Sequence, residues 1–185
     1  MINFNNVKII KKIGAGMFGI AYLVKYEDNK YALKIQKILE KQAKKNYNYE
    51  IWRELDLYKY IDKLNENDQL FFMKLYGYEI YDNCTRKQIR PIKIDSKIDP
   101  NDKFSQKIKK MDESLWCIKF LLEYKGNLTL EKFLFKNHEL KTKQIYSIML
   151  QIIKIHMILY KGGYSHGDMH AGNIMINKTN KNILC

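Results

Sequence analysis

Cysteine is scarce in this chain, and no long apolar run is present. The cysteines are odd in number and lack CxxC spacing, so the sequence predicts neither a disulfide framework nor a zinc knuckle: they are Cys84, Cys117 and Cys185. The most apolar segment, 145–160, is interrupted by polar residues and is shorter than the ~20 residues of a membrane-spanning helix. Residues 1–6 lack the charged and apolar regions of a signal peptide. We therefore expect an intracellular, reduced and soluble protein that does not enter a membrane.

Arginine is also rare, although the chain is strongly basic. The formal net charge is +13 with 33 lysines and arginines, but only Arg53, Arg86 and Arg90 are arginine. Proteins that recognise phosphates or base edges rely on the planar guanidinium fork, which lysine lacks. A lysine excess beside many Asn, Ile and Tyr residues indicates compositional bias, so nucleic-acid binding is not the expected main function.

The hydrophobic pattern predicts strands first and helices later. Short apolar runs, separated by a glycine cluster and by a polar turn, indicate strands at 8–13, 20–26 and 31–36. Further strand candidates lie at 70–81 and 115–123, with a closing hairpin made of 174–176 and 183–185. Helical spacing of apolar residues predicts helices at 41–64, 130–135 and 142–161.

The stretch 82–114 interrupts this pattern. It contains both prolines of the chain, Pro91 and Pro100, together with many lysines and only weak periodicity. We interpret it as a long, mobile basic insertion, and we favour a solvated loop over a binding site for an acidic partner.

Residues 14–19 form a GxGxxG pattern between two predicted strands. A Rossmann fingerprint would have to open a helix, and a Walker A loop would need lysine where Ile20 stands. A glycine-rich hairpin whose backbone amides cover the phosphates of a nucleotide fits better, because a Cβ would block close approach of the backbone. For this motif alone, a plain hairpin turn is an open alternative.

Lys34 lies in the middle of the third predicted strand, where its ammonium group requires a polar partner such as a phosphate. The following helix offers two carboxylates that could hold this lysine, Glu50 and Glu54. We choose Glu54, because Leu55 and Tyr58 place it beside the apolar stripe of the helix, whereas Glu50 has polar neighbours. A lysine that faces solvent is the alternative.

A polar segment near the end of the chain, 166–173, has the sequence HGDMHAGN. Asp168 and Asn173 are five residues apart, the spacing by which phosphotransferase loops hold a proton acceptor beside a magnesium ligand. The segment therefore predicts a phosphate-transfer site.

The same segment carries two histidines four residues apart, His166 and His170, which is also the spacing of a zinc-binding helix. Such a helix needs a glutamate where Gly167 stands, and Gly172 argues against a helix here. We therefore do not expect a zinc hydrolase.

In this order and spacing, the motifs resemble the protein-kinase superfamily from Ile9 to Cys185. The matching residues are the glycine motif at 14–19, Ala32-Leu33-Lys34, Glu54, Leu122-Glu123-Tyr124 and 168–173. The resemblance implies an α+β fold of two lobes. A five-stranded antiparallel N-lobe with one helix would span residues 1–124, and an incomplete, mainly helical C-lobe would span 125–185.

By the same resemblance, ATP and Mg²⁺ are the expected cofactors, with ATP between the lobes. Lys34, held by Glu54, would contact the α- and β-phosphates, and Asp168, beside His170, would accept the proton of the substrate hydroxyl. Asn173 would bind the metal. The expected nucleotide-binding residues are Ile13, Gly14, Ala15, Gly16, Met17, Phe18, Gly19, Ile20, Ala21, Lys34, the gatekeeper Leu122, Glu123, Tyr124 and Lys125.

Several positions depart from the family pattern. Gly167 replaces the arginine common before the catalytic aspartate, and Ala21 replaces the valine common over the adenine. His170 stands where protein kinases usually carry lysine, and a histidine there is similar to haspin-like and aminoglycoside- or choline-phosphotransferase relatives. An Asp-Phe-Gly segment would be due about a dozen residues beyond Asn173, where the chain ends at Cys185.

The resemblance therefore predicts an ATP-dependent phosphotransferase of the Ser/Thr protein-kinase type, truncated before the second metal-binding carboxylate on which full activity depends. Two alternatives stay open. One is an inactive pseudokinase fragment that acts as a binding or regulatory module, and the other is a kinase of small molecules such as choline or aminoglycosides. The sequence does not specify the protein substrate or the regulatory partner.

Overall fold

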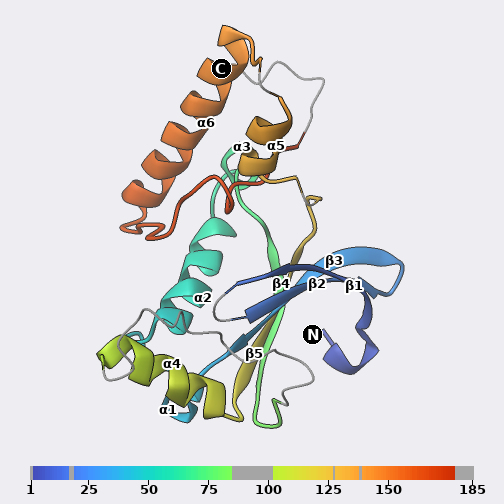
Figure 1. The fold of residues 1–185 in the computed structure, drawn as a ribbon, viewed down its shortest axis with the longest axis vertical. Coiled ribbons are helices and arrows are strands. Elements are labelled where there is room, and N and C mark those ends of the chain that lie inside the picture. Colours follow the sequence, from blue (N-terminus) through green and yellow to red (C-terminus); the bar gives the residue numbers. More distant parts are fainter. Residues whose placement is uncertain (1, 17–18, 85–101, 127, 138, 178–185) are drawn as a thin grey trace. The chain divides into compact units, whose positions relative to one another are not determined.

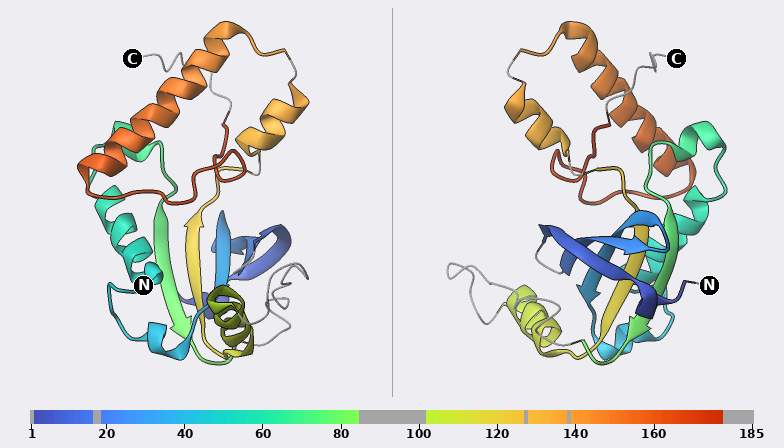
Figure 2. Two further views of the ribbon diagram at one scale, coloured as in Figure 1. Left: turned by 60° about the vertical axis from the view of Figure 1, so that its left-hand side comes forward. Right: turned by 90° about the vertical axis from the view of Figure 1, so that its right-hand side faces the viewer.

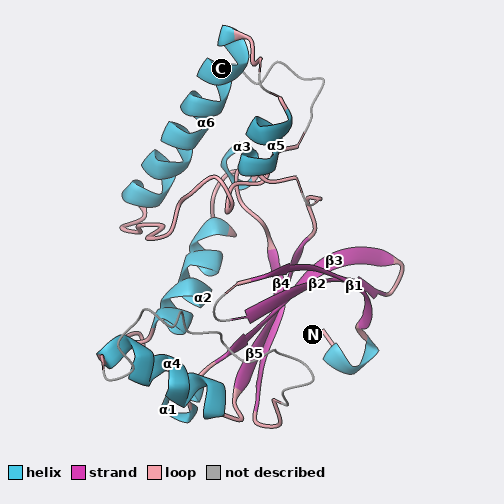
Figure 3. Cartoon of the chain, viewed as in Figure 1, coloured by secondary structure: helices cyan, strands magenta, loops and turns pink. Residues whose placement is uncertain are grey.

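The computed structural model divides the chain into two compact units. The first comprises Met1–Tyr58 and Lys74–Tyr124, and the second comprises Lys59–Met73 and Lys125–Cys185. All five strands belong to the first unit, whereas the regular structure of the second unit is helical (Figure 3). The structure describes residues 2–16, 19–84, 102–126, 128–137 and 139–177.

A five-stranded antiparallel sheet forms the centre of the first unit (Figure 1), as predicted. The strands run in the order β1-β2-β3-β5-β4, so that β3 and β5 are central neighbours. The segment predicted as a strand from residue 70 becomes one only at Leu75, because residues 70–72 form a turn and a bend. The strands are β1 (Lys8–Ala15), β2 (Gly19–Tyr26), β3 (Asn29–Lys37), β4 (Leu75–Tyr81) and β5 (Cys117–Glu123).

Both faces of the sheet carry buried apolar side chains, because successive residues of a strand point to opposite faces. On one face, Leu33 and Ile35 of β3 pack with Leu121 of β5, and the short helix η1 (Phe4–Asn6) contributes to the same cluster. On the other face, Phe120 and its neighbours pack against the apolar side of a helix. This helix, α2, lies along the sheet in both views of Figure 2.

Helix α2 (Glu50–Ile61) is shorter than the predicted helix at 41–64. A separate turn of helix, α1 (Glu40–Ala43), precedes it, and residues 44–49 are not helical. The side chain of Asn46 accepts a hydrogen bond from the backbone of Asn48, a local bond that competes with helix formation. The indole of Trp52 donates to the Gln42 carbonyl oxygen at 2.9 Å and thereby ties α2 to α1.

The interpretation of 82–114 as a mobile loop is wrong for its second part, where helix α4 (Lys103–Glu113) forms. Asp102 accepts hydrogen bonds from the backbone and the hydroxyl of Ser105, which satisfies a free amide at the start of α4. At its end, the buried ammonium of Lys37 donates to the carbonyl oxygens of Asp112 and Ser114. Residues 85–101 of the predicted insertion lie outside the described part of the chain.

Cys84 and Cys117 form a disulfide, which corrects the expectation that the cysteines are unpaired. Their Cα atoms are 5.5 Å apart although the residues are 33 positions apart in the sequence. The pairing of β4 with β5 brings them together, because Tyr81, three residues before Cys84, lies opposite Cys117. Both side chains are buried in the cluster with Leu121.

The second unit consists mainly of helices packed through a few specific contacts. The Tyr60 hydroxyl donates to the Ile158 carbonyl oxygen at 2.9 Å, and the Lys154 ammonium lies 3.1 Å from the Asp68 carboxylate. In the described part of the chain, no helix has both the length and the apolar character needed to cross a bilayer. The helices are α3 (Glu66–Gln69), α5 (Leu130–Lys136) and α6 (Thr142–Lys161), together with the last turn of α2.

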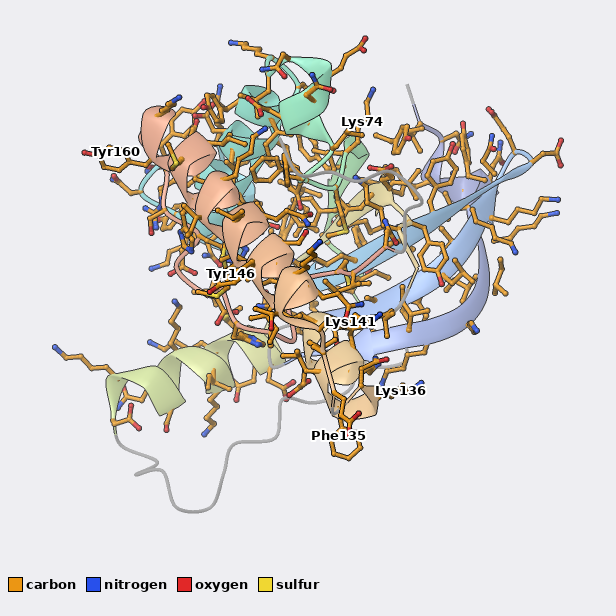
Figure 4. All side chains as sticks on the ribbon, turned by 90° about the horizontal axis from the view of Figure 1, so that it is seen from above. Lys74, Phe135, Lys136, Lys141, Tyr146 and Tyr160 are labelled. Atoms are coloured by element: carbon orange, nitrogen blue, oxygen red, sulfur yellow. A yellow bond between two sulfur atoms is a disulfide. The ribbon has the colours of Figure 1, made fainter. Side chains whose placement is uncertain are left out.

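One side of α6 is apolar and exposed. Its exposed side chains are Ile145, Tyr146, Met149, Leu150, Ile153, Met157 and Tyr160. Tyr146 and Tyr160 of α6 are labelled in Figure 4, together with the exposed Phe135 at the end of α5. In the segment predicted as the first strand of a closing hairpin, 174–176, Met175 forms an isolated antiparallel bridge with Thr129. The second predicted strand, 183–185, lies outside the described residues, so the hairpin stays a prediction.

Candidate functional site

The glycine-rich connection between β1 and β2 is closed by a hydrogen bond from the Gly16 amide to the Gly19 carbonyl oxygen at 2.9 Å. Gly19 is required by the sheet itself, because a Cβ there would overlap the backbone oxygen of Ile35. Gly16 is different, since no described atom lies within 4 Å of a Cβ placed on it. Packing within the unit therefore does not explain Gly16, whereas close approach of a ligand to its backbone would.

Lys34 and Glu54 form the ion pair that the sequence analysis predicts. The Nζ atom of Lys34 lies 2.8 Å from Oε1 of Glu54, which joins the middle of β3 to α2. The rejected candidate, Glu50, lies 3.9 Å from the ammonium of Lys107 on α4. Side-chain exposures of 36% for Lys34 and 29% for Glu54 leave this pair accessible to a ligand.

Two further side chains lie near this ion pair, and the sequence analysis did not assign either of them to the site. Phe120 lies opposite Lys34 in the β3–β5 register, and its ring centroid is 5.3 Å from the Lys34 ammonium. Tyr58 lies one helical turn after Glu54. Burial is the largest cause that raises the pKa of Tyr58, and the nearby charge of the Glu54 carboxylate raises it further.

The predicted adenine-binding segment lies at the end of β5. Leu122 is buried and is paired with Ala32 on β3 and Leu75 on β4. The Glu123 amide donates to the Lys74 carbonyl oxygen at 2.8 Å, so this backbone donor is already engaged. An adenine contact would therefore require other backbone groups of the segment, such as those of Tyr124.

The remaining predicted nucleotide-binding residues have different locations. Lys125 belongs to the second unit, where its ammonium donates to the carbonyl oxygens of Leu70 and Phe72. Ile13, Ala15, Ile20 and Ala21 lie in β1 and β2 of the first unit, beside Gly14 and Gly19. Met17 and Phe18 lie outside the described residues.

In the second unit, residues 166–173 form a loop without helix, which we call the Asp168 loop. The side-chain amide of Asn173 donates to the Asp168 carboxylate and to the Asp168 backbone oxygen, both at 2.9 Å. These bonds use the nitrogen of the Asn173 side chain and leave its oxygen as the group suited to a cation. Gly167 adopts a φ of 70°, a conformation that favours glycine over the arginine expected from the family pattern.

His170 is fixed by its own loop. Its Nδ1 atom accepts a hydrogen bond from the Gly172 amide at 3.1 Å, so the neutral ring carries its proton on Nε2. That Nε2 atom lies 3.9 Å from Oδ1 of Asp168, beyond direct hydrogen-bond distance. A Cβ at Gly172 would lie 2.9 Å from the His170 ring, so the glycine is needed for this arrangement.

The start of α5 holds the Asp168 loop in place through backbone hydrogen bonds. The amides of Leu130 and Glu131 donate to the carbonyl oxygens of Ile174 at 2.7 Å and Ala171 at 3.0 Å. The first amides of a helix have no partner inside the helix, and here the loop supplies two acceptors. The hydroxyl of Thr129 accepts from the next turn, at the Lys132 amide.

The described residues contain no group of three or more histidines, cysteines, aspartates and glutamates that could enclose a metal ion. Asp168 and Asn173 together offer a carboxylate and an amide oxygen. This donor set fits Mg²⁺ that arrives with a nucleotide, because Mg²⁺ keeps several waters and takes phosphate oxygens as ligands. It does not fit a cage made of protein atoms alone.

The predicted site residues are therefore assembled in two groups, each within one unit. The first unit contains the glycine-rich connection with Lys34 and Glu54, and the second contains Asp168, His170 and Asn173. A search of protein-family models and of curated protein sequences finds no match for this chain.

Proposed function

We propose that this protein is an ATP:hydroxyl phosphotransferase of the protein-kinase type, with a Ser/Thr-type protein substrate and a two-lobed fold. The observation that carries the proposal is the 2.8 Å pair of Lys34 and Glu54 beside a glycine-rich connection. A lysine held by a carboxylate on a neighbouring helix presents a fixed positive charge to phosphate oxygens. The open space beside Cα of Gly16, where a Cβ would meet no described atom, supports the same assignment.

In the proposed reaction, the first group binds the nucleotide. Lys34 contacts the α- and β-phosphates, Glu54 keeps its ammonium in position, and the backbone around Gly16 covers the phosphates. The buried Leu122 borders the adenine. These interactions place the γ-phosphate for transfer and supply no chemical group that reacts.

The second group handles the acceptor hydroxyl. The Asp168 carboxylate orients the hydroxyl and takes its proton while the hydroxyl oxygen bonds to the γ-phosphorus and the bond to the ADP oxygen breaks. Asn173 holds Asp168 through its amide nitrogen and offers its amide oxygen to Mg²⁺. Mg²⁺ bound there with the nucleotide would neutralise phosphate charge.

Nucleotide binding is the first test. Isothermal titration of the purified chain with Mg-ATP should show binding, and Lys34→Ala should weaken the affinity by about tenfold or more, because a charge-assisted contact is lost. Lys30→Ala is the matched control, since Lys30 is an exposed lysine of the same strand, and its affinity should stay within about twofold of the original. Absence of binding, or equal effects of the two substitutions, would refute the nucleotide site.

Transfer of labelled phosphate to a generic protein substrate is the second test. Asp168→Asn should abolish transfer and leave nucleotide affinity within about twofold, because the exposed Asp168 acts on the acceptor. A chain that binds Mg-ATP through Lys34 but transfers no phosphate would instead be a binding or regulatory module.

A small-molecule kinase is a second candidate, favoured by the position of His170 beside Asp168. The Nε2 atom of the ring lies 3.9 Å from Oδ1 of the Asp168 carboxylate. A substrate panel that compares proteins with choline and aminoglycosides separates the two candidates. Phosphorylation of the small molecules alone would favour this second function.

A further inference from the structure

Strand β1 lies at one end of the sheet, and its outer edge is accessible. The strand order β1-β2-β3-β5-β4 gives β1 a single neighbour, and no other strand in the described part of the chain pairs with it. At every second residue of an edge strand, the backbone amide and carbonyl oxygen point away from the sheet and can pair with another chain. The residues from Lys8 to Lys12 are all exposed, so this edge is open over more than half of the strand.

The charged side chains of β1 and β2 have one sign. Residues 1–26 contain no aspartate or glutamate, whereas lysine occurs four times, at Lys8, Lys11, Lys12 and Lys25. Lys8 lies directly opposite Lys25 in the pairing of β1 with β2, and like charges in opposite positions repel each other. Lys25 has an acidic neighbour in the following turn, Asp28, at 3.2 Å. Carboxylates beside β1 would offset the remaining repulsion.

A mainly apolar cavity begins at the same strand. Its volume is about 210 Å³, and Ile9 of β1 lines it together with Phe4 and Val7 from the segment before the strand. The side chain of Ile9 is 57% exposed. In a strand added beside β1, a residue that points to the same face as Ile9 would lie next to this cavity. An aliphatic side chain at that position would bury apolar surface.

We propose that the outer edge of β1 is a docking site for an acidic, extended peptide segment of a partner protein, which adds a strand to the sheet. Backbone hydrogen bonds along the edge supply affinity in this mode of recognition, and the side chains supply specificity. Carboxylates of the segment face the three lysines of β1, and an aliphatic side chain lies beside Ile9. The inference does not depend on the proposed phosphotransferase function.

A second copy of this chain fits the edge less well than an acidic segment. Every charged residue of β1 is a lysine, so two paired β1 edges would bring lysines of one copy close to lysines of the other. The formal net charge of +13 on each copy adds to this repulsion. Lysines on an edge strand discourage such self-pairing, whereas they attract a strand that carries carboxylates.

The first experiment titrates the full chain with a capped synthetic peptide of eight residues, the length of β1, in which glutamate and valine alternate. We expect this peptide to bind, because it offers carboxylates, aliphatic side chains and a complete set of backbone amides. A peptide in which proline replaces each valine has the same charge but lacks half of the amides. It should bind at least about tenfold more weakly. Equal binding of the two peptides, or no binding of either, would overturn the inference.

The second experiment removes the charge of the edge with the triple variant Lys8→Gln/Lys11→Gln/Lys12→Gln. Its affinity for the glutamate–valine peptide should fall by about tenfold or more, because the facing carboxylates lose their partners. Sedimentation of the same variant tests the other role of edge lysines. If the variant self-associates and the original chain binds no peptide, these lysines only prevent self-pairing, and the inference is wrong.

The matched control neutralises three exposed lysines of α4 in the same unit, with Lys103→Gln/Lys109→Gln/Lys110→Gln. It removes the same amount of charge from another surface and should change the affinity by less than about twofold. Equal losses in the two triple variants would show a general attraction between a basic protein and an acidic peptide, and would overturn the inference. Thermal unfolding shows whether each variant is folded.

Hydrogen exchange of single backbone amides locates the bound peptide on the unmodified chain, so it decides the inference even if a variant is unstable. The glutamate–valine peptide should slow the exchange of the outward-pointing amides of β1 by about tenfold or more. The opposite edge strand, β4, is the internal control, because it contains Glu79 and no lysine. Slower exchange at β4 in place of β1, or unchanged exchange at β1, would overturn the inference.

Discussion

The two units of this protein differ in how much of their apolar surface is buried. In the first unit the sheet carries a buried cluster on each face, one around Leu121 and one around Phe120. In the second unit the described residues bury few apolar side chains, among them Ile158 and Leu159, while one side of α6 stays exposed. A sheet can bury both faces of a short chain, whereas one long helix with few neighbours buries only one stripe.

The same contrast separates the two groups of candidate site residues. Lys34 lies against the buried ring of Phe120 in the core of the first unit, and it holds Glu54 through their ion pair. Asp168 is exposed, and its loop is held mainly by backbone hydrogen bonds. We therefore expect core substitutions to act on the Lys34–Glu54 pair and substitutions at helix ends to act on the Asp168 loop.

The largest expected effect tests the difference in burial. Leu121→Ala should lower the free energy of unfolding of the first unit by about 2–5 kcal/mol, because it leaves a cavity in a fully buried cluster. Leu150→Ala, on the exposed side of α6, should change stability by less than about 1 kcal/mol. Urea unfolding followed by tryptophan fluorescence reports on the first unit, which contains both tryptophans, Trp52 and Trp116, and circular dichroism at 222 nm follows the helical second unit, to which Leu150 belongs. Similar losses for the two variants would contradict the contrast.

A smaller effect is expected where the backbone cannot give way. Gly19→Ala places a Cβ against the carbonyl oxygen of Ile35, closer than real Cβ atoms approach. We expect a loss of about 1–3 kcal/mol in the same fluorescence assay, because β2 must shift relative to β3. Gly16→Ala serves as the control within the same connection and should leave stability within about 0.5 kcal/mol.

Substitution of Gly162 in the second unit should cost less stability than substitution of Gly19 in the first. Gly162→Ala brings a Cβ against the ring of Tyr60, the end of a flexible side chain that can move. The movement should cost about 0.5–1.5 kcal/mol, since it breaks the bond from the Tyr60 hydroxyl to Ile158. Circular dichroism at 222 nm is the suitable probe, and a loss larger than that of Gly19→Ala would reverse the comparison.

The smallest effect concerns pH and the second unit. The hydrogen bonds from Asn65 and Lys154 lower the pKa of Asp68 below its ordinary value of 3.8. A lowered pKa stabilises the fold above 3.8 and loses this contribution as the pH falls through the folded pKa. Asp68→Asn should therefore lower the free energy of unfolding at neutral pH by less than about 1 kcal/mol, because the Lys154 side chain of the pair is half-exposed and solvent screens its charge. The difference between the two proteins should vanish once the pH has fallen through the folded pKa of Asp68, and a constant difference would argue against an ionic cause.

Much of this fold follows from sequence patterns. Helix α6 occupies the predicted 142–161, because its apolar spacing is strong and glycines follow it. The helix α4 was missed although Phe104, Ile108 and Met111 have helical spacing, since the surrounding lysines outweighed these three residues. The disulfide could not be predicted, because Cys84 and Cys117 meet only through the pairing of β4 with β5.

The site was predictable in part. Choosing Glu54 over Glu50 succeeded, because proximity to an apolar stripe indicates which carboxylate of a helix faces the sheet. Phe120 was not assigned to the site, because its place opposite Lys34 follows from the pairing of β3 with β5. The protein-kinase resemblance itself and the roles of Asp168 and Asn173 stay predictions.

The attachment of the Asp168 loop to α5 has a practical consequence for anyone who screens variants of this protein. A substitution at Thr129 removes the N-cap of α5 and loosens the helix amides that donate to the loop at Ala171 and Ile174. A screen for the proposed phosphate transfer, scored on turnover alone, would therefore rank Thr129 with Asp168 and Asn173. Only a parallel record of helicity would reveal that the damage began at the end of a helix.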